Sequence, residues 1–204
     1  MSVSPRSSAT LTRGNIGFFR RIVVLGPKGV GKSALVIRFC EGIFHSSYLP
    51  TIEDTYLATI KIEAQVYNLE IIDTGGQDEY SILSSQCTIG VHGYLLVFDI
   101  TDYFSFELLQ LLHERLVNML GLDTIPCILI GMKLDEEEER AVETVQAEQL
   151  ARDWMCPYIE CSAKEGTHVE TVFHTLMREM EKPTIPVAAA SHKESNNNQR
   201  CSSM

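Results

Sequence analysis

The hydrophobic positions of the chain follow two different periods, and these separate predicted strands from predicted helices. Residues 21–25, 94–98 and 125–130 are short, almost unbroken apolar runs, as expected of strands buried on both faces. Residues 56–62 and 66–72 alternate apolar and polar positions across a short polar link, which predicts a β-hairpin. A further short strand is expected at Tyr158 and Ile159.

Other segments have the spacing of helices. Residues 34–39 and about 104–120 are predicted helices, and a third is indicated by Ala147, Leu150, Ala151 and Trp154. The clearest stripe has i, i+3, i+4, i+7 spacing and consists of Val169, Val172, Phe173, Leu176, Met177 and Met180. Because strands alternate with helices, the pattern predicts an α/β fold with a mostly parallel sheet and helices on both faces. Ligands of such sheets bind at the carboxyl ends of the strands.

A glycine-rich loop lies between the first strand and the first helix. Residues 26–33 read Gly-Pro-Lys-Gly-Val-Gly-Lys-Ser, which fits the phosphate-loop pattern G-x-x-x-x-G-K-[ST]. Glycines let the backbone bend around an anion, so that several N–H groups converge on it at the positive end of the helix. Lys32 is expected to reach the β- and γ-phosphates, and the Ser33 hydroxyl to hold Mg²⁺. The motif predicts a nucleoside triphosphate, but it does not specify the base.

A second polar motif follows the strand predicted at residues 69–72. It reads Asp73-Thr74-Gly75-Gly76-Gln77. An acidic residue that leaves a buried strand beside a phosphate loop suits the Mg²⁺ shell, and a following glycine can present its N–H to the γ-phosphate. Gln77 is then placed to orient a water molecule for in-line attack. Asp-x-x-Gly alone also fits an ordinary turn, so the functional interpretation depends on the upstream loop.

Two further motifs follow later strands and predict a base site. They are Lys133-Leu134-Asp135 and Cys161-Ser162-Ala163-Lys164. Asp135 can accept hydrogen bonds from the N1 and N2 donors of guanine, which adenine lacks. The stem of Lys133 can lie over the ring, and the amide of Ala163 can meet O6. Either motif alone is weak.

Composition limits the alternatives. The chain has 204 residues, 45% of them hydrophobic, which suits one well-buried domain. Its net charge of −10 argues against a nucleic-acid groove, so no nucleic-acid partner is expected. Six cysteines without C-x-x-C spacing indicate free thiols in a reducing compartment. No stretch approaches 18 apolar residues and the first 13 residues lack the apolar core of a signal peptide, so a cytoplasmic protein is expected.

In this order, the four motifs resemble those of the Ras superfamily of small GTPases over nearly all of residues 20–181. The resemblance implies a Ras-like G domain, a P-loop NTPase fold with a six-stranded, mostly parallel sheet. Within the superfamily the chain is most similar to the Rheb group, on residues 48–53, 76–82, 92–94 and 201–204. Rheb proteins also have a long basic side chain at the position of Lys28.

The resemblance implies roles for individual residues. Tyr48 and Thr51 fall in the first switch segment, and Asp73 to about Ser85 form the second. Mg²⁺ is expected on Ser33, Thr51 and Asp73, and catalytic roles on Gln77, Lys32 and Tyr48. Phe44 would stack on the base. The expected contacts of GTP or GDP are Gly29, Val30, Gly31, Lys32, Ser33, Ala34, Phe44, Tyr48, Thr51, Gly76, Lys133, Asp135, Ser162, Ala163 and Lys164.

The function implied is a signalling switch that binds GTP and slowly hydrolyses it to GDP. Effector proteins would bind the ordered switch segments, and an activating protein and an exchange factor would be further partners. The switch would act on a growth-control kinase pathway. One alternative is a pseudo-GTPase, a binding module with weak or no turnover. Another is a small-molecule kinase, which would need an arginine-bearing lid, and no arginine cluster follows the helix after Ser33.

Three positions depart from the superfamily pattern. The motif N-K-x-D has Met132 in place of asparagine, which removes a donor to the base and predicts faster nucleotide release. Gly75 replaces the usual alanine and is expected to loosen the second switch. Lys28 replaces the glycine of Ras and crowds the entry of an arginine finger, so intrinsic turnover should be slow.

The two ends of the chain differ in composition from the middle. We expect a flexible extension at residues 1–19, the G domain at 20–182 and a flexible tail at 183–204. Cys201-Ser202-Ser203-Met204 fits a prenylation box, and its final Met favours a farnesyl group on Cys201, although a plain serine-rich tail is the alternative. A single lipid without a polybasic patch binds membranes reversibly, here the cytosolic face of endomembranes or the plasma membrane.

Overall fold

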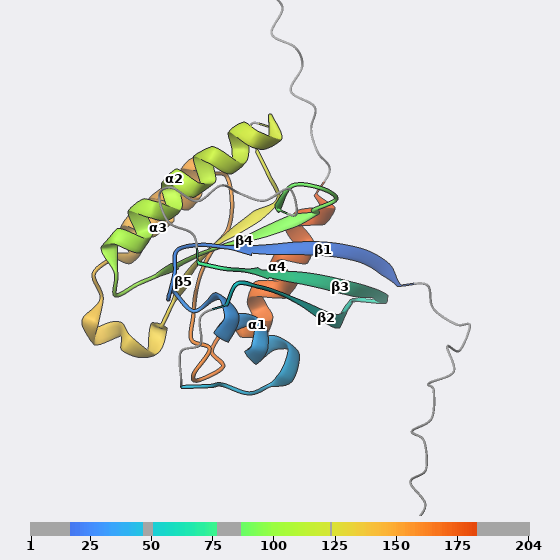
Figure 1. Cartoon of the computed structure of the whole chain (residues 1–204), viewed down its shortest axis with the longest axis horizontal. Coiled ribbons are helices and arrows are strands. Elements are labelled where there is room, and N and C mark those ends of the chain that lie inside the picture. Colours follow the sequence, from blue (N-terminus) through green and yellow to red (C-terminus); the bar gives the residue numbers. More distant parts are fainter. Residues whose placement is uncertain (1–16, 47–50, 77–86, 123, 183–204) are drawn as a thin grey trace, which may run out of the picture.

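The computed structural model describes residues 17–46, 51–76, 87–122 and 124–182, and it is built around one six-stranded sheet (Figure 1). The order across the sheet is β2-β3-β1-β4-β5-β6. Strands β2 and β3 are antiparallel, and the other neighbouring pairs are parallel. The predicted α/β fold with a mostly parallel sheet is therefore confirmed. The strands are β1 (Phe18–Leu25), β2 (Glu53–Ile62), β3 (Gln65–Thr74), β4 (Gly93–Asp99), β5 (Cys127–Met132) and β6 (Tyr158–Cys161).

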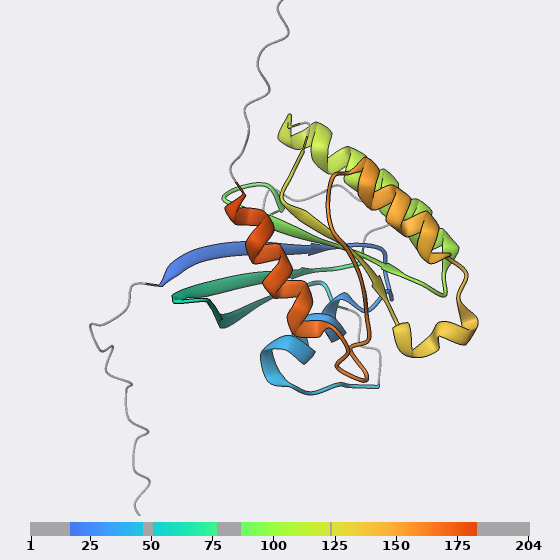
Figure 2. The same cartoon turned by 180° about the vertical axis from the view of Figure 1, so that it is seen from behind.

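Helices cover both faces of the sheet. Helices α1 and α4 lie on one face, and α2 and α3 lie side by side on the other (Figures 1 and 2). No helix within the described ranges is long and apolar enough to cross a membrane. The helices are α1 (Lys32–Glu41), α2 (Tyr103–Leu120), α3 (Thr144–Asp153), α4 (Val169–Glu181) and the short 3₁₀ helix η2 (Leu134–Glu139).

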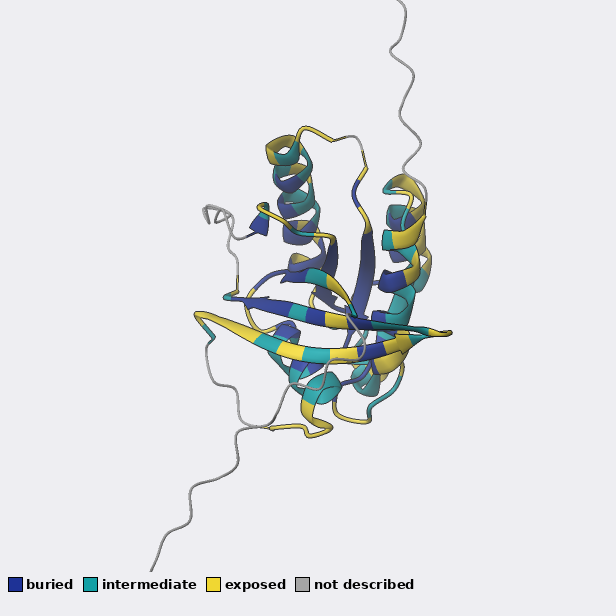
Figure 3. Cartoon of the chain, turned by 90° about the vertical axis from the view of Figure 1, so that its right-hand side faces the viewer, coloured by how far each residue is buried: buried dark blue, intermediate teal, exposed yellow. Residues whose placement is uncertain are grey.

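Strand β1 shows why the central apolar runs are unbroken. Successive side chains of a strand point to opposite faces of the sheet. Ile22 and Val24 pack into the core beneath α1 and α4, whereas Val23 and Leu25 pack into the core beneath α2 and α3. All four are fully buried, and Figure 3 shows the buried positions concentrated between the two sets of helices. The sheet is therefore packed against an apolar core on each face, and the loops at its carboxyl edge extend from this rigid base.

Several boundaries differ from the sequence-based predictions. Strand β5 begins at Cys127 and not at Ile125, because Pro126 has no N–H to pair; its carbonyl accepts a bond from the N–H of Tyr94. Strand β3 continues through Thr74, whose hydroxyl donates to the carbonyl of Val24 at 2.7 Å, so Asp73 lies within the strand. Strand β1 begins at Phe18, before residue 20.

The acidic run after β5 forms a short helix. Residues 135–139 belong to the 3₁₀ helix η2, in which Glu137, Glu138 and Glu139 are exposed. Lys133, which precedes η2, has a left-handed backbone with φ of 66°. Lys133 and Asp135, on either side of Leu134, therefore follow β5 at the carboxyl edge of the sheet.

Candidate functional site

A cleft of about 1260 Å³ lies at the carboxyl edge of the sheet. Its walls come from the loops that follow β1, β5 and β6, from the start of α1, and from the segment that leads into β2. The loop motifs, distant in sequence, therefore meet in one place, as expected for a parallel sheet. The predicted site residues that line the cleft are Gly29, Gly31, Lys32, Ser33, Ala34, Phe44, Thr51, Gly76, Lys133, Asp135, Ala163 and Lys164.

The glycine-rich loop ends at the N-terminus of α1. Gly31 is the N-cap residue, with φ of 102°, a value that favours glycine. No side chain caps this helix end, and its first turn contains no acidic residue. The free N–H groups and the helix dipole therefore make this end of the cleft suitable for an anion.

Lys32 lies beneath the same loop. Its ammonium group donates to the carbonyls of Gly26 at 2.9 Å and Pro27 at 2.7 Å, and the residue is only 4% exposed. Burial lowers the pKa of Lys32 to about 8, while the nearby carboxylate of Asp73 acts in the opposite direction. A buried ammonium is held at the loop by these carbonyls, and a bound phosphate would supply the negative charge that favours its protonated form.

Ser33, Thr51 and Asp73 have the arrangement expected of a magnesium site. The hydroxyls of Ser33 and Thr51 are 2.8 Å apart, although the residues belong to α1 and to the segment before β2. Asp73 is fully buried, and neither of its carboxylate oxygens has a hydrogen-bond partner within the described part of the chain. Burial raises the pKa of Asp73, while the nearby Ser33 hydroxyl and Lys32 ammonium act in the opposite direction and lower it. An unpaired buried carboxylate beside two hydroxyls suits a hard cation that prefers oxygen ligands.

At the other end of the cleft, Asp135 is held by two partners from the loop after β6. It accepts a hydrogen bond from the Ser162 hydroxyl at 2.6 Å and an ion pair from Lys164 at 3.3 Å. Burial would raise the pKa of Asp135, but these two partners outweigh it and hold the pKa below its usual value. The carboxylate is therefore ionised and fixed in direction, as required of an acceptor for the N–H donors of a base.

The three departures from the superfamily pattern all lie at this site. Met132 is buried and lines the cleft, and its Cε would be 3.3 Å from a Cβ at Gly31, so the thioether packs against the start of α1. A Cβ at Gly75 would be 2.5 Å from the carbonyl oxygen of Ile52, so glycine permits the close approach of two loop segments. Lys28 also lines the cleft.

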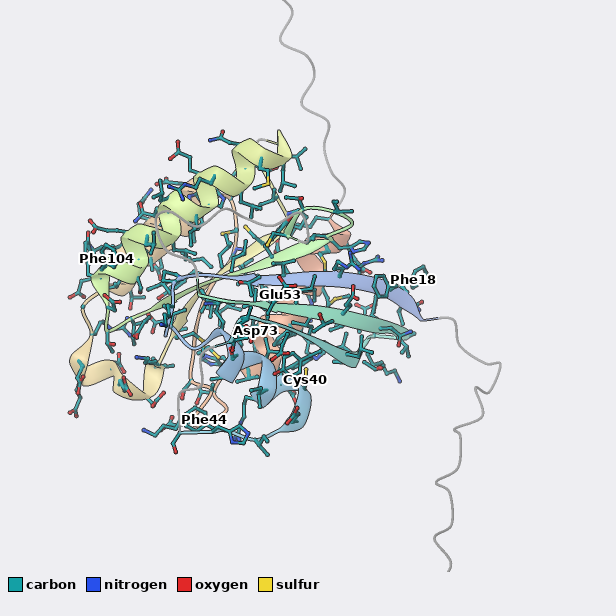
Figure 4. All side chains as sticks on the ribbon, viewed as in Figure 1. Phe18, Cys40, Phe44, Glu53, Asp73 and Phe104 are labelled. Atoms are coloured by element: carbon teal, nitrogen blue, oxygen red, sulfur yellow. The ribbon has the colours of Figure 1, made fainter. Side chains whose placement is uncertain are left out.

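Some predicted site residues are placed differently. Val30 is buried in the core, and Ser162 is buried behind Asp135; neither side chain lines the cleft. Phe44 lies on the loop after α1 and is 38% exposed (Figure 4). Tyr48, Gln77, Cys201 and the second switch beyond Gly76 lie outside the described residues.

Sequence reasoning missed a group of residues that line the cleft. They come from α1, from the loop that follows it, from β2 with its preceding residue, and from η2. Only their nearness in sequence to Phe44, Thr51 and Asp135 pointed to them. They are Ile37, Ile43, His45, Ser46, Ile52, Glu53, Asp54, Tyr56 and Glu136.

A comparison with protein families decides what kind of domain carries this cleft. Residues 21–182 match the model of the family described as Ras family. The chain belongs to the Ras family. The resemblance found in the motifs is thereby confirmed, and the match includes every element that forms the cleft.

This Ras family chain is similar to Rheb proteins over most of its length. It is 44% identical over 163 residues to a GTP-binding protein Rheb homolog of Dictyostelium discoideum, covering 80% of this chain and 88% of the relative. It is 42% identical over 163 residues to the GTP-binding protein Rheb of Homo sapiens, covering 80% and 89%. The small monomeric GTPase RhbA of Aspergillus fumigatus is 39% identical over 168 residues, covering 82% and 90%. The predicted similarity to the Rheb group is confirmed.

Proposed function

We propose that this chain is a small GTP-binding signalling switch of the Rheb type that slowly hydrolyses GTP to GDP. One observation carries the proposal: two complementary groups line the same cleft. The uncapped N-terminus of α1, together with the buried Lys32, suits phosphates. The ionised and fixed carboxylate of Asp135 suits the N–H donors of guanine. Similarity to proteins named as GTP-binding, and to one named as a GTPase, supports the same function.

The base would be selected at Asp135. Ser162 and Lys164 hold the carboxylate before any ligand arrives, so little ordering is left for binding. Guanine offers N1–H and N2–H donors to this acceptor, whereas adenine would leave it unpaired. Lys133 and Phe44 line the cleft, and their side chains would pack against the ring of the base.

The triphosphate would lie along the loop at residues 28–33. Lys32 would neutralise phosphate charge, and the N–H groups at the start of α1 would donate to the phosphate oxygens. Ser33, Thr51 and Asp73 would hold Mg²⁺, which shields the charge between the β- and γ-phosphates when it is bound. Gln77, which would orient the attacking water, and Tyr48 lie outside the described residues and remain predictions.

The switch would depend on contacts between Thr51, Ile52 and the residues after β3. The Ser33–Thr51 bond ties the first switch segment to α1, and the approach of Gly75 to Ile52 brings the second segment against it. A γ-phosphate that engages Thr51 and Gly76 would bind one arrangement of these segments more tightly than the diphosphate does. That difference in affinity is what a population shift requires.

The base assignment is tested by replacing Asp135 with Asn. We expect the fold to persist and GDP affinity to fall by about 1–3 kcal/mol, roughly 5- to 150-fold, while ADP affinity changes little. Competition titrations with both nucleotides measure this. Glu137→Gln is a matched control, because it removes an exposed carboxylate two residues away in η2. Unchanged preference for GDP over ADP in the Asp135 variant would contradict the assignment.

Turnover separates a GTPase from a pseudo-GTPase. Single-turnover hydrolysis of GTP with saturating Mg²⁺ should be slow but measurable in the wild-type chain. The variant Gln77→Leu should bind GTP with similar affinity and hydrolyse it more slowly still, because its side chain cannot orient water. Complete absence of hydrolysis over hours in the wild type would favour the binding module.

The partners in the proposal rest on the sequence and on the Rheb similarity. We propose effector proteins at the two switch segments, an activating protein and an exchange factor, and action on a growth-control kinase pathway. Farnesylation at Cys201 would attach the chain reversibly to the cytosolic face of endomembranes or the plasma membrane. Incorporation of labelled farnesyl by the wild type and not by Cys201→Ser would support the attachment, and equal labelling would exclude this cysteine.

A further inference from the structure

We propose that Asp99 is a positioning residue of the nucleotide site, which anchors the Lys133 side chain along the cleft wall where the family asparagine is absent. Asp99 belongs to none of the four motifs, and it reaches the site from the end of the neighbouring strand β4. The inference rests on the proposed function, because the ligand that Lys133 would contact is the guanine nucleotide.

Sheet register brings the two residues together. Strand β4 ends at Asp99 and β5 ends at Met132, and these two residues are directly paired. The N–H of Ile100 donates to the carbonyl of Met132 at 3.1 Å, which continues the pairing beyond β4. Lys133 is therefore the first residue past the strand on one side, and its ammonium group lies 2.5 Å from Oδ2 of Asp99.

The carboxylate of Asp99 is itself fixed. Its other oxygen, Oδ1, accepts from the N–H of Thr101 at 2.9 Å and from the Thr101 hydroxyl at 2.7 Å. The side chain is only 7% exposed. One oxygen is thus used to hold the carboxylate in place, and the second is left for Lys133. Glu136, the other acidic neighbour of Lys133, is 3.9 Å away and 42% exposed, so it is the weaker anchor.

The position of Lys133 shows what the anchor does. Lys133 lines the cleft, whereas Asp99 is buried and is not part of the lining. The ammonium group is therefore held beneath the wall, and the aliphatic stem forms part of the surface that a base would meet. Burial would lower the pKa of Lys133, but Asp99 outweighs it and raises the pKa, which keeps the group charged.

Met132 explains why this anchor matters in this chain. Its thioether packs against Gly31 and has no N–H donor for the base or for the phosphate loop. A lysine without a partner samples many rotamers, and binding would then have to order it at a cost in affinity. With Asp99 in place, the stem is ordered before the nucleotide arrives.

The test is a double-mutant cycle on the full chain, with release of a fluorescent GDP analogue as the measurement. Asp99→Asn keeps the size of the side chain and its bonds with Thr101, but it removes the charge that holds Lys133. We expect on the order of tenfold faster release, the size typical of one hydrogen bond to a charged group. Lys133→Met should accelerate release at least as much. In the Lys133→Met background, Asp99→Asn should change release less than about twofold, because Asp99 acts through Lys133.

A merely structural role for Asp99 would give a different result, namely the same acceleration in both backgrounds. That result would overturn the inference, and so would slower release in Asp99→Asn, which would mean that the ion pair withholds Lys133 from the nucleotide. No effect of Lys133→Met would overturn it without any Asp99 variant. Glu148→Gln is the charge-matched control, since it removes an exposed partner of Arg152 on α3 and should leave release unchanged.

Failure of the inference can be told apart from failure of the proposed function. If the wild-type chain prefers GDP to ADP but the cycle shows no coupling, only the role of Asp99 is overturned. If the wild type shows no preference for GDP, both are overturned. Coupling together with a GDP preference supports both.

Discussion

At Met132, a buried thioether occupies the place of the asparagine in the family motif N-K-x-D. The residue is 2% exposed, and its side chain packs against Gly31 at the start of α1. It therefore joins the base end of the cleft to the phosphate loop by apolar contact, where an amide would do so by hydrogen bonding. Contact of this kind preserves the fold, but it provides no polar interaction with a base.

Restoring the amide tests this difference. Met132→Asn should slow GDP release, since a donor returns beside the base; a gain of about 1–3 kcal/mol corresponds to roughly 5- to 150-fold. Release of a fluorescent GDP analogue, chased with excess GDP, measures it. Met132→Leu is the matched control, because it keeps an apolar side chain without a donor, and it should resemble the wild type. Equal release in the Asn and Leu variants would refute the interpretation.

At the scale of the elements, an ion-pair network fixes the segment between β5 and β6. Arg140 donates through both terminal nitrogens to Glu160 on β6, at 2.7 and 2.8 Å. Glu160 also accepts from the hydroxyls of Tyr158 at 2.7 Å and Thr144 at 3.1 Å. Burial would raise the pKa of Glu160, but the hydrogen bonds from Arg140 and Tyr158 outweigh burial and hold the pKa below its usual value. The network holds the chain that follows η2 against the strand that carries the 161–164 motif.

Replacing Glu160 with Gln should therefore destabilise the domain. The Arg140 side chain is 12% exposed, so its charge would be left almost buried with only the exposed Glu137, 3.5 Å away, as a partner, at a cost of about 3 kcal/mol. Urea unfolding of the GDP-loaded chain at pH 7 measures the change. The exposed pair of Arg152 and Glu148, 3.7 Å apart, supplies the control Glu148→Gln, which should cost less than about 0.5 kcal/mol. Similar costs for the two variants would contradict this account.

How far sequence predicts such elements depends on how local the cause is. The strand at Ile22–Leu25 and the α4 stripe at residues 169–180 were predictable, because burial pattern and helical spacing can be read within one segment. The loop at 26–33 was predictable because its motif is contiguous. The Asp99–Lys133 pair was not, since it depends on the register of β4 against β5. The approach of Gly75 to Ile52 likewise joins two loops whose contact is set by tertiary structure.

For the whole molecule, burial makes the charged forms of several ionisable groups less stable in the folded chain than in the unfolded one. Lys32 has a pKa of about 8, so the folded state loses stability as pH falls from about 10.5 to 8, where only the unfolded chain gains a proton. Asp73 has a raised pKa and acts with the opposite sign, favouring the folded state as pH falls. Both groups lie at the proposed phosphate and Mg²⁺ site, so ligand binding would offset costs that the empty site imposes.

His113 gives the most direct test of this balance, because it lies away from the cleft. Its ring stacks on Trp154 at 3.8 Å between α2 and α3, and burial lowers its pKa to about 4. Between about pH 6.5 and 4 the unfolded chain binds a proton that the folded chain does not, so stability should fall as pH falls. Because the ring is partly exposed, the loss should be about 1–2 kcal/mol.

His113→Phe keeps an aromatic ring on Trp154 without a titrating group. Urea unfolding at pH 7.5 and 5 should therefore show a smaller decrease in the free energy of unfolding for this variant than for the wild type. The same decrease in both proteins would assign the pH dependence to other groups.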